Sequence, residues 1–221
     1  MSAGWLSFFS DLTEQLPLVL HGLQNTLLLA LSVSVSGLVW GIVLFFLSLS
    51  VHAPIKKLTR LCMDFFIGTP LIIILFVIYY GLPQTGIHLS PFTVALTGFT
   101  LNVGAYNAAY MTTAYNALNV SQAEAATVQG FSRWQCFRMI LLPQVLIASV
   151  PALTNQVISN VKDSTIAFLI QYPEFFARVQ EVAAADFEFF RAYLFAALVY
   201  LIVITLIIIL LRTLRRFLPV F

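Results

Sequence analysis

The chain has 221 residues, of which 60% are hydrophobic and only 9% are charged. A soluble domain carries roughly 25% charged residues, which keep its surface hydrated. The composition therefore excludes a water-soluble globule and predicts that membrane lipid covers part of the surface. The formal net charge is only +2, which gives no basis for a nucleic-acid partner.

The first 16 residues have the pattern of a short amphipathic helix. Apolar side chains recur at helical spacing, whereas polar side chains take the other face. Because such a helix lies in the headgroup region of a bilayer, residues 1–16 are expected to form an interfacial helix; a partly ordered tail is the alternative. The apolar residues are Trp5, Leu6, Phe9, Leu12 and Leu16, and the polar ones are Ser7, Asp11 and Glu14.

Five longer stretches are candidates for membrane crossings. A helix needs about 20 mainly apolar residues to cross the hydrocarbon core of a bilayer. The sequence therefore predicts an all-α integral membrane protein with about five transmembrane helices, in a single domain of residues 1–221. The stretches are Leu27–Leu49, Cys62–Tyr80, Phe92–Ala114, Ile140–Asn160 and Ala192–Leu211.

Basic residues are unevenly distributed between the two sides of this five-crossing path. Eight of the 11 lysines and arginines follow the first, third and fifth stretches. Because loops rich in Lys and Arg stay in the cytoplasm, we expect the amino terminus outside and the carboxyl terminus in the cytoplasm. The eight residues are Lys56, Lys57, Arg60, Arg133, Arg138, Arg212, Arg215 and Arg216.

The cytoplasmic segment between the third and fourth stretches has its own helical signals. Ser121-Gln-Ala-Glu124 has the form of a capping box, in which the serine hydroxyl accepts from the amide three residues on. Gly130 lies where a left-handed residue would end that helix, and Ser132-Arg-Trp-Gln135 forms a second box. The pattern predicts a rigid elbow that fits a groove on a partner protein; an ordinary well-capped loop is the alternative.

Seven residues in and after this elbow form a recognisable pattern: Glu124, Ala125, Ala126, Gly130, Ile140, Leu142 and Pro143. The pattern resembles the signature loop of ATP-binding-cassette (ABC) import permeases. The resemblance implies a type I importer permease fold in which residues 119–140 form the cytoplasmic coupling loop. It also implies a separate cytoplasmic ATPase that binds ATP and Mg²⁺, with no cofactor in this chain.

Most of the chain resembles the polar amino acid branch of these permeases. The shared motifs are Gly68-Thr-Pro70-Leu, Tyr79-Tyr-Gly81-Leu-Pro83, Ala105-Tyr106, Asn155-Gln156 and Lys162-Asp163-Ser164-Thr165. The chain departs from the branch at several positions that are usually charged or glycine, including Ile67, Ala109, Thr112, Thr113 and Ser121. These departures resemble the less conventional (M-type) subunit of two-permease arginine importers. They favour a homologous heterodimer over a homodimer, and a basic, arginine-like substrate.

Polar side chains within the predicted crossings, or near the outer end of the fourth, are candidates for the pore or gate. Because such groups are costly in lipid, they face protein or water; packing or interfacial anchoring is the alternative to a role in the pore. The candidates are Asn102, Asn107, Asn155, Lys162, Asp163, Ser164 and Thr165. The three histidines and two cysteines lack metal-ligand spacing, so neither a metal site nor a disulfide is expected.

The sequence thus predicts a transport subunit of a bacterial inner membrane rather than an enzyme. None of its ten glycines is followed by lysine, so the phosphate-binding G-x-x-x-x-G-K loop is absent. Transport would occur by alternating access, with a second permease subunit, an external solute-binding protein and the separate ATPase. The alternative is a secondary transporter or channel subunit that is not coupled to ATP.

Overall fold

The computed structural model describes residues 8, 10 and 12–215, and all regular structure in this part of the chain is helical. The predictions made for Trp5, Leu6, Ser7, Phe9, Asp11 and Arg216 lie outside these residues. The principal helices are α2 (Leu16–Ser48), α3 (Ala53–Gly68), α4 (Leu71–Phe76), α5 (Pro91–Asn116), α6 (Val120–Val128), α7 (Arg133–Cys136), α8 (Leu142–Asp163), α9 (Phe175–Asp186) and α10 (Phe189–Arg215).

Short tighter or wider turns extend several of these helices. A π-helical turn, Val77–Gly81, and a 3₁₀ turn, Leu82–Thr85, continue α4. A second π-helical turn, Phe137–Leu141, joins α7 to α8, and a 3₁₀ segment, Ser164–Ile170, follows α8. The chain from α7 to the end of this segment is therefore almost continuously helical.

Three described helical segments are long and apolar enough to cross a membrane. They are Leu16–Ser48, Arg133–Ile170 and Phe189–Thr213, and the bent pair of α3 and α4 is a fourth candidate. The helix α5 has 26 residues, enough for about 39 Å at 1.5 Å per residue. The five-crossing path and the sides of the two termini remain predictions of the sequence.

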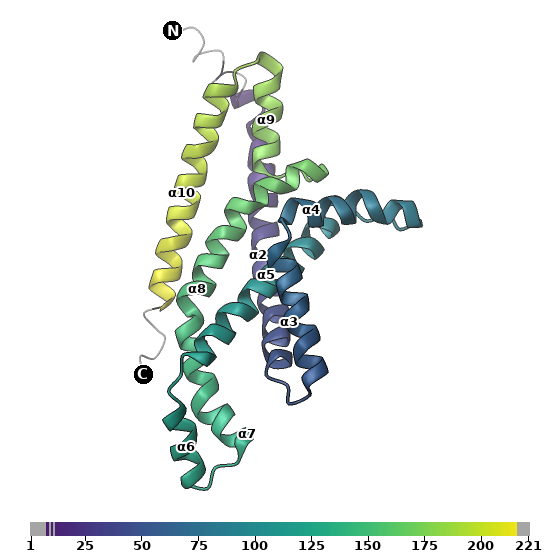
Figure 1. Cartoon of the computed structure of the whole chain (residues 1–221). Helices are drawn as coiled ribbons and strands as arrows, with labels where there is room; N and C mark the ends of the chain where they lie inside the picture. Colours follow the sequence, from purple (N-terminus) through teal and green to yellow (C-terminus); the bar gives the residue numbers. More distant parts are fainter. Residues whose placement is uncertain (1–7, 9, 11, 216–221) are drawn as a thin grey trace.

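The predicted second crossing, Cys62–Tyr80, is wrong as a single straight helix. The α3 helix ends at Gly68, and the chain turns by 100° before the helical run that begins with α4. Pro70 causes this break, because a residue before proline is forced out of the helical region; Thr69 has φ −93° and ψ 126°. The α4 segment therefore projects sideways from the bundle (Figure 1).

The centre of the molecule is the close packing of α2 on α5. Small residues permit this approach, as is common between membrane helices. A Cβ atom at Gly104 of α5 would lie 2.4 Å from Cδ1 of Trp40, and one at Gly41 of α2 would lie 2.6 Å from Cβ of Asn107. The α8 helix packs against both α2 and α5, so the three helices form one packed group.

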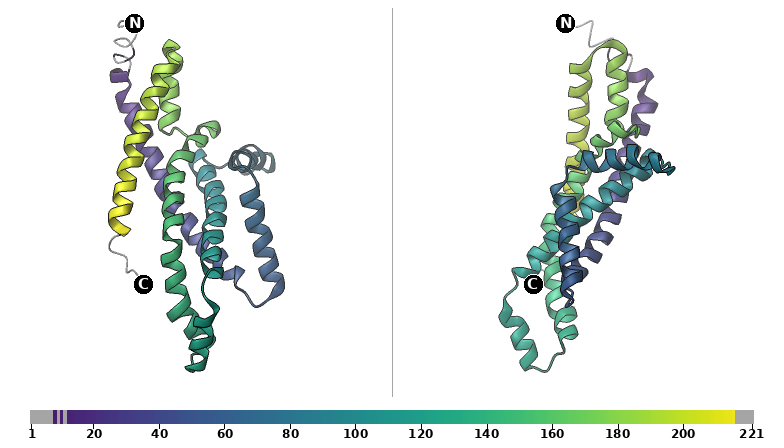
Figure 2. Two further views of the ribbon diagram at one scale, coloured as in Figure 1. Left: turned by 60° about the vertical axis from the view of Figure 1, so that its left-hand side comes forward. Right: turned by 45° about the vertical axis from the view of Figure 1, so that its right-hand side comes forward.

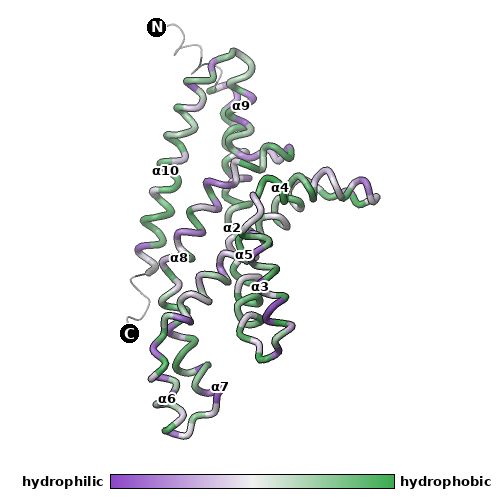
Figure 3. The backbone as a smooth tube through the Cα atoms, viewed as in Figure 1, coloured by the Kyte–Doolittle hydropathy of each residue, from purple (hydrophilic) through white to green (hydrophobic). Residues whose placement is uncertain are grey.

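The two ends of the bundle differ. The α6–α7 elbow extends beyond the other helices at one end, whereas α9 lies at the opposite end with the start of α10 (Figures 1 and 2). The α10 helix is predominantly hydrophobic along its length, whereas α8 has hydrophilic stretches (Figure 3). Among the described residues, the buried polar side chains include Thr26 of α2, Asn102 and Asn107 of α5, and Ser149 and Asn160 of α8.

Candidate functional site

A cavity of about 500 Å³ lies between α5, α8 and the α3–α4 break. One face of α5 and one face of α8 line it, because residues three or four apart project from the same side of a helix. The break contributes backbone and small side chains. Its polar lining residues are Asn102, Tyr106 and Tyr110 of α5, Gln156, Ser159 and Asp163 of α8, and Thr69 of the break. We call this space the polar cavity.

Hydrogen bonds fix much of the lining of the polar cavity. The Tyr110 hydroxyl donates to Oε1 of Gln156 at 3.4 Å, and Nε2 of Gln156 donates to Oδ1 of Asn160 at 3.2 Å. Nδ2 of Asn160 in turn donates to the Ser34 hydroxyl at 3.0 Å. Separately, Asn102 donates to the carbonyl of Phe66 at 2.7 Å. The first three bonds form a relay from α5 through α8 to α2.

Among the described residues, Asp163 is the one charged side chain that lines the polar cavity. It is the last residue of α8 and is half-buried, whereas the neighbouring Lys162 is exposed. Adjacent helical residues do not face each other, so the lysine does not project into the same space. The described part of the chain shows no ion pair to the Asp163 carboxylate. No salt bridge therefore neutralises this carboxylate, although the adjacent Lys162 attracts it electrostatically.

A second cavity, of about 420 Å³, lies further along α5 and α8, nearer the elbow. Tyr110 lines this cavity as well as the polar one. The remaining lining is mainly alanine and leucine, so a polar solute finds few hydrogen-bonding groups there. These residues are Thr113 and Ala114 of α5, Ala117 and Leu118 just after it, and Ala148, Ser149 and Ala152 of α8. We call this space the apolar cavity.

The elbow has the sharp corner that the sequence predicts. Gly130 has a φ of +84°, its N–H donates to the carbonyl of Thr127, and the N–H of Phe131 donates to that of Ala126. The Ser132 capping box is confirmed, because the Ser132 and Gln135 side chains accept from each other's backbone amides. Left-handed glycine with these bonds closes α6, so the turn is locally determined.

The predicted capping box at Ser121 is wrong. Asn119 caps α6 instead, accepting from the N–H and the hydroxyl of Ser121 through Oδ1. Asparagine is as good an N-cap as serine, so the helix begins at Val120, two residues earlier than a Ser121 cap would place it. Glu124 is consequently an exposed helical residue rather than the closing member of a box.

The elbow also exposes large side chains. Val128 is 89% exposed and Trp134 is 61% exposed. Glu124 and Ala125 are exposed near them, whereas Ala126 is buried against the other arm. Ile140, Leu142 and Pro143, at the start of the long α8 run, are half-buried.

The seven pore candidates are not all brought together. Asn102 and Asp163 line the polar cavity. Asn107 is buried beside α2, and Asn155 is exposed and lines a groove against α10. Lys162 is exposed, whereas the hydroxyls of Ser164 and Thr165 donate to the carbonyls of Val161 and Lys162 in their own helical run.

A polar cluster that the sequence did not predict lies at the end opposite the elbow. Glu174 is fully buried and caps α9 by accepting from the amides of Phe176 and Ala177. It also accepts from the hydroxyls of Thr26 on α2 and Tyr200 on α10. Glutamate is not among the preferred N-cap residues, so neither this cap nor its two distant partners could be predicted from the sequence.

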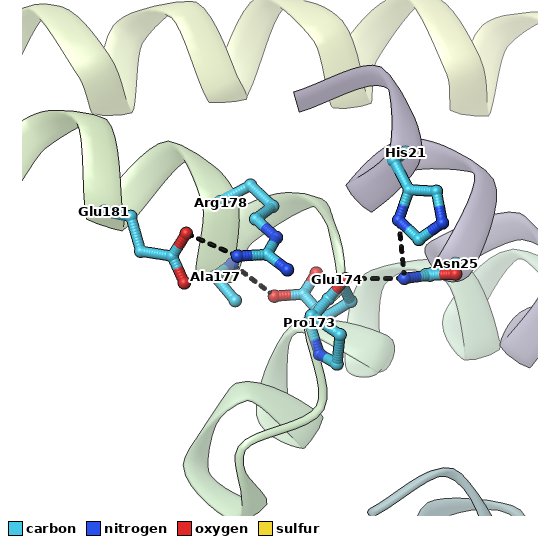
Figure 4. Close-up of polar contacts among 7 residues, drawn as sticks. All are labelled: His21, Asn25, Pro173, Glu174, Ala177, Arg178 and Glu181. Atoms are coloured by element: carbon cyan, nitrogen blue, oxygen red, sulfur yellow. Dashed lines mark hydrogen bonds and ion pairs between the residues drawn. The ribbon is translucent and has the colours of Figure 1, made fainter. Parts of the chain in front are cut away.

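Neighbouring contacts reinforce this cluster. Nδ2 of Asn25 on α2 donates to the carbonyl of Pro173 at 2.9 Å and approaches His21 at 3.4 Å (Figure 4). Arg178 of α9, whose side-chain stem packs beside Gly22 of α2, forms an ion pair with Glu181 at 2.7 Å (Figure 4). The cluster therefore holds α9 against α2 and does not contribute to the polar cavity.

Comparison with known proteins gives consistent matches over most of the chain. Residues 37–218 match the family described as binding-protein-dependent transport system inner membrane component. The probable amino-acid ABC transporter permease protein YckA of Bacillus subtilis (strain 168) is 34% identical over 187 residues, which cover 85% of this chain and 83% of YckA. The arginine transport system permease protein ArtQ of the same organism is 30% identical over 200 residues, covering 90% of this chain and 91% of ArtQ.

A solved structure also matches this chain over nearly its whole length. The crystal structure of an amino acid ABC transporter with histidines has a chain that superposes with a TM-score of 0.88 at 27% sequence identity. The match covers 95% of this chain and 97% of that one. The arrangement of α2, α5 and α8 is therefore shared with a protein of known architecture.

Proposed function

The chain belongs to the family of binding-protein-dependent transport system inner membrane components, and we propose that it carries a basic amino acid through the polar cavity between α5 and α8. It is a permease subunit of an amino acid ABC importer. The observation that carries the proposal is the Asp163 carboxylate, which has no ion-pair partner among the described residues and lies in a cavity otherwise lined by hydroxyl and amide groups, small residues and the aliphatic side chains of Ile67, Leu71 and Ile166.

The chemistry of this lining favours a cationic substrate. A carboxylate without a fixed cation attracts a guanidinium or ammonium group and repels an acidic side chain. The amides of Asn102 and Gln156 and the tyrosine hydroxyls supply neutral partners for the remaining polar groups of an amino acid. An acidic substrate would bring a second negative charge into the same space.

The experiment compares uptake by the assembled importer with and without the carboxylate. Asp163→Asn is expected to lower the uptake of labelled arginine or lysine by about tenfold or more, the effect of losing about 1.4 kcal/mol. Asp64→Asn is the matched control, because Asp64 is an exposed carboxylate on α3 outside the cavity. Unchanged selectivity between basic and neutral amino acids in Asp163→Asn would rule out this role.

We further propose that the elbow is where a cytoplasmic ATPase, which binds ATP and Mg²⁺, engages this chain. Exposed Val128 and Trp134 favour a protein partner, because large apolar side chains on a water-facing surface mark contact sites. The residues assigned to this role are those of the signature loop: Glu124, Ala125, Ala126, Gly130, Ile140, Leu142 and Pro143.

A second permease subunit is proposed to cover the exposed face of α8. Ala148, Pro151, Asn155 and Lys162 are exposed along one side of this helix, where small and polar residues suit a helix partner better than lipid. A homologous subunit is favoured over an identical one because of the departures at Ile67 and elsewhere. The external solute-binding protein would deliver the substrate from the side opposite the elbow.

A further inference from the structure

We propose that Tyr110 and Gln156 form the gate that separates the polar cavity from the apolar cavity. The inference deepens the proposed function, because it assumes that the amino acid occupies the polar cavity. Tyr110 is the residue that lines both spaces. Across the crevice on α8, Ala152 lines the apolar cavity and Gln156, one turn further on, lines the polar cavity.

The bond between the two residues has the geometry of a contact that opens readily. The Tyr110 hydroxyl and Oε1 of Gln156 are 3.4 Å apart, beyond the 2.5–3.0 Å typical of a hydroxyl bond. Neutral hydrogen bonds contribute little net stability even at ideal length. The closure therefore needs little free energy to break, as a gate that moves in every transport cycle requires.

Gln156 is the fixed half of this pair. Its Nε2 group donates to buried Asn160, which donates to the hydroxyl of Ser34 on α2. With its amide nitrogen engaged in this way, the Gln156 side chain presents its oxygen to the crevice. The half-buried Tyr110 ring makes its contact from the other side, beside Tyr106.

The two cavities differ in what they offer a polar solute. The polar cavity supplies a carboxylate, amides and hydroxyls, whereas alanines and a leucine dominate the apolar one. A charged amino acid that passes Tyr110 loses its partners and has no second site in which to remain. Passage beyond the gate is thus a release step rather than a transfer between two binding sites.

The elbow is connected to both halves of the gate. Tyr110 lies in α5, which leads directly into α6, and Gln156 lies in α8, which continues from α7 through one π-helical turn. A force on the elbow therefore acts on the two helices whose separation determines the distance between the Tyr110 hydroxyl and the Gln156 oxygen. No additional segment is needed to transmit the motion.

The test measures access to the polar cavity from the elbow side. Ser159→Cys places a thiol in that cavity, after Cys62 and Cys136 have been replaced by serine to remove the native thiols. The assembled importer is labelled in inside-out vesicles with a membrane-impermeant thiol reagent, without ATP. Tyr110→Ala is expected to raise the labelling rate about tenfold, because the closed state loses its barrier. Tyr110→Phe removes only the hydroxyl and is expected to raise the rate to a smaller extent.

Tyr106→Ala is the matched control, because Tyr106 lines only the polar cavity and lies one turn away on the same face of α5. An equal increase in this control, rapid labelling of the parent chain, or no increase in the Tyr110→Phe protein would overturn the proposal. Labelling requires no transport, so its outcome is independent of whether Asp163 selects a basic substrate. If labelling changes as expected but Asp163→Asn does not alter uptake, the gate is supported and the proposed basic substrate is rejected.

Discussion

The corner of the elbow depends on one residue whose replacement has a calculable effect. Gly130 has a φ of +84°, and a Cβ atom placed on it would meet no other atom within 4 Å. Substitution by valine therefore adds no steric clash with the rest of the chain. The whole cost arises from forcing a β-branched residue into a left-handed conformation.

That cost is large enough to detect. A non-glycine residue in this region costs about 1–2 kcal/mol, and a β-branched side chain brings the total to about 2–3 kcal/mol. A change of about 2 kcal/mol alters a conformational equilibrium by a factor of about 30. Gly130→Val would therefore shift the corner about 30-fold towards rearranged conformations, and Gly130→Asn, which tolerates the left-handed region better, would have a weaker effect.

The assay is recovery of the partner ATPase with the tagged permease, together with ATP-driven uptake. Gly86→Val is a closely matched control, because Gly86 has a φ of +85° with no atom within 4 Å of its Cβ position and lies in the loop before α5, away from the elbow. We expect Gly130→Val to lower ATPase recovery and uptake, and Gly86→Val to leave recovery unchanged. Full recovery and uptake with Gly130→Val, or an equal loss with Gly86→Val, would refute the reasoning.

Three further predictions concern stability, each measured as the thermal unfolding of the purified chain. Glu174→Gln is expected to destabilise the fold by about 2–3 kcal/mol, because the amide replaces one acceptor oxygen with a donor facing other donors; no shift would contradict the buried cap. Asn119→Ala is expected to lower stability by about 1 kcal/mol and Ser121→Ala by less. A larger loss in Ser121→Ala would show that Ser121, not Asn119, caps α6. Gly104→Ala is expected to cost about 1–3 kcal/mol by displacing Trp40, whereas Gly68→Ala, with open space around it, should be tolerated.

The features predicted correctly from the sequence are those that a few neighbouring residues determine. The left-handed corner at Gly130 and the box at Ser132 depend on contacts between residues at most five apart in the chain. The error at Ser121 arose because Asn119 offered a competing cap two residues earlier. Local signals therefore located the elbow, but they did not determine whether Asn119 or Ser121 caps α6.

The break at Pro70 was also a local signal, but it lay inside an apolar run that satisfied the length of a crossing. Hydropathy does not register the conformational restriction that proline places on Thr69. The sequence therefore predicted which residues are apolar enough to cross the membrane, but it did not predict the 100° bend between them.

The site itself depends on the register between distant helices. The contact of Tyr110 with Gln156 joins residues 46 apart in the sequence, and that of Asn160 with Ser34 joins residues 126 apart. Each single helix presents several polar residues, and only packing decides which of them share a cavity. Asn107 and Asn155 were as plausible in the sequence as Asn102, yet they face α2 and the α10 side respectively.

Uptake of labelled arginine into proteoliposomes tests the central claim most directly. The claim is that a separate ATPase, acting through the elbow, opens the path between α5 and α8. The vesicles contain the permease pair with its binding protein, and they are compared with and without the ATPase. We predict accumulation that requires both the ATPase and ATP and that Gly130→Val abolishes or strongly reduces. Accumulation by the permease subunits alone, driven by an ion gradient, would contradict the account.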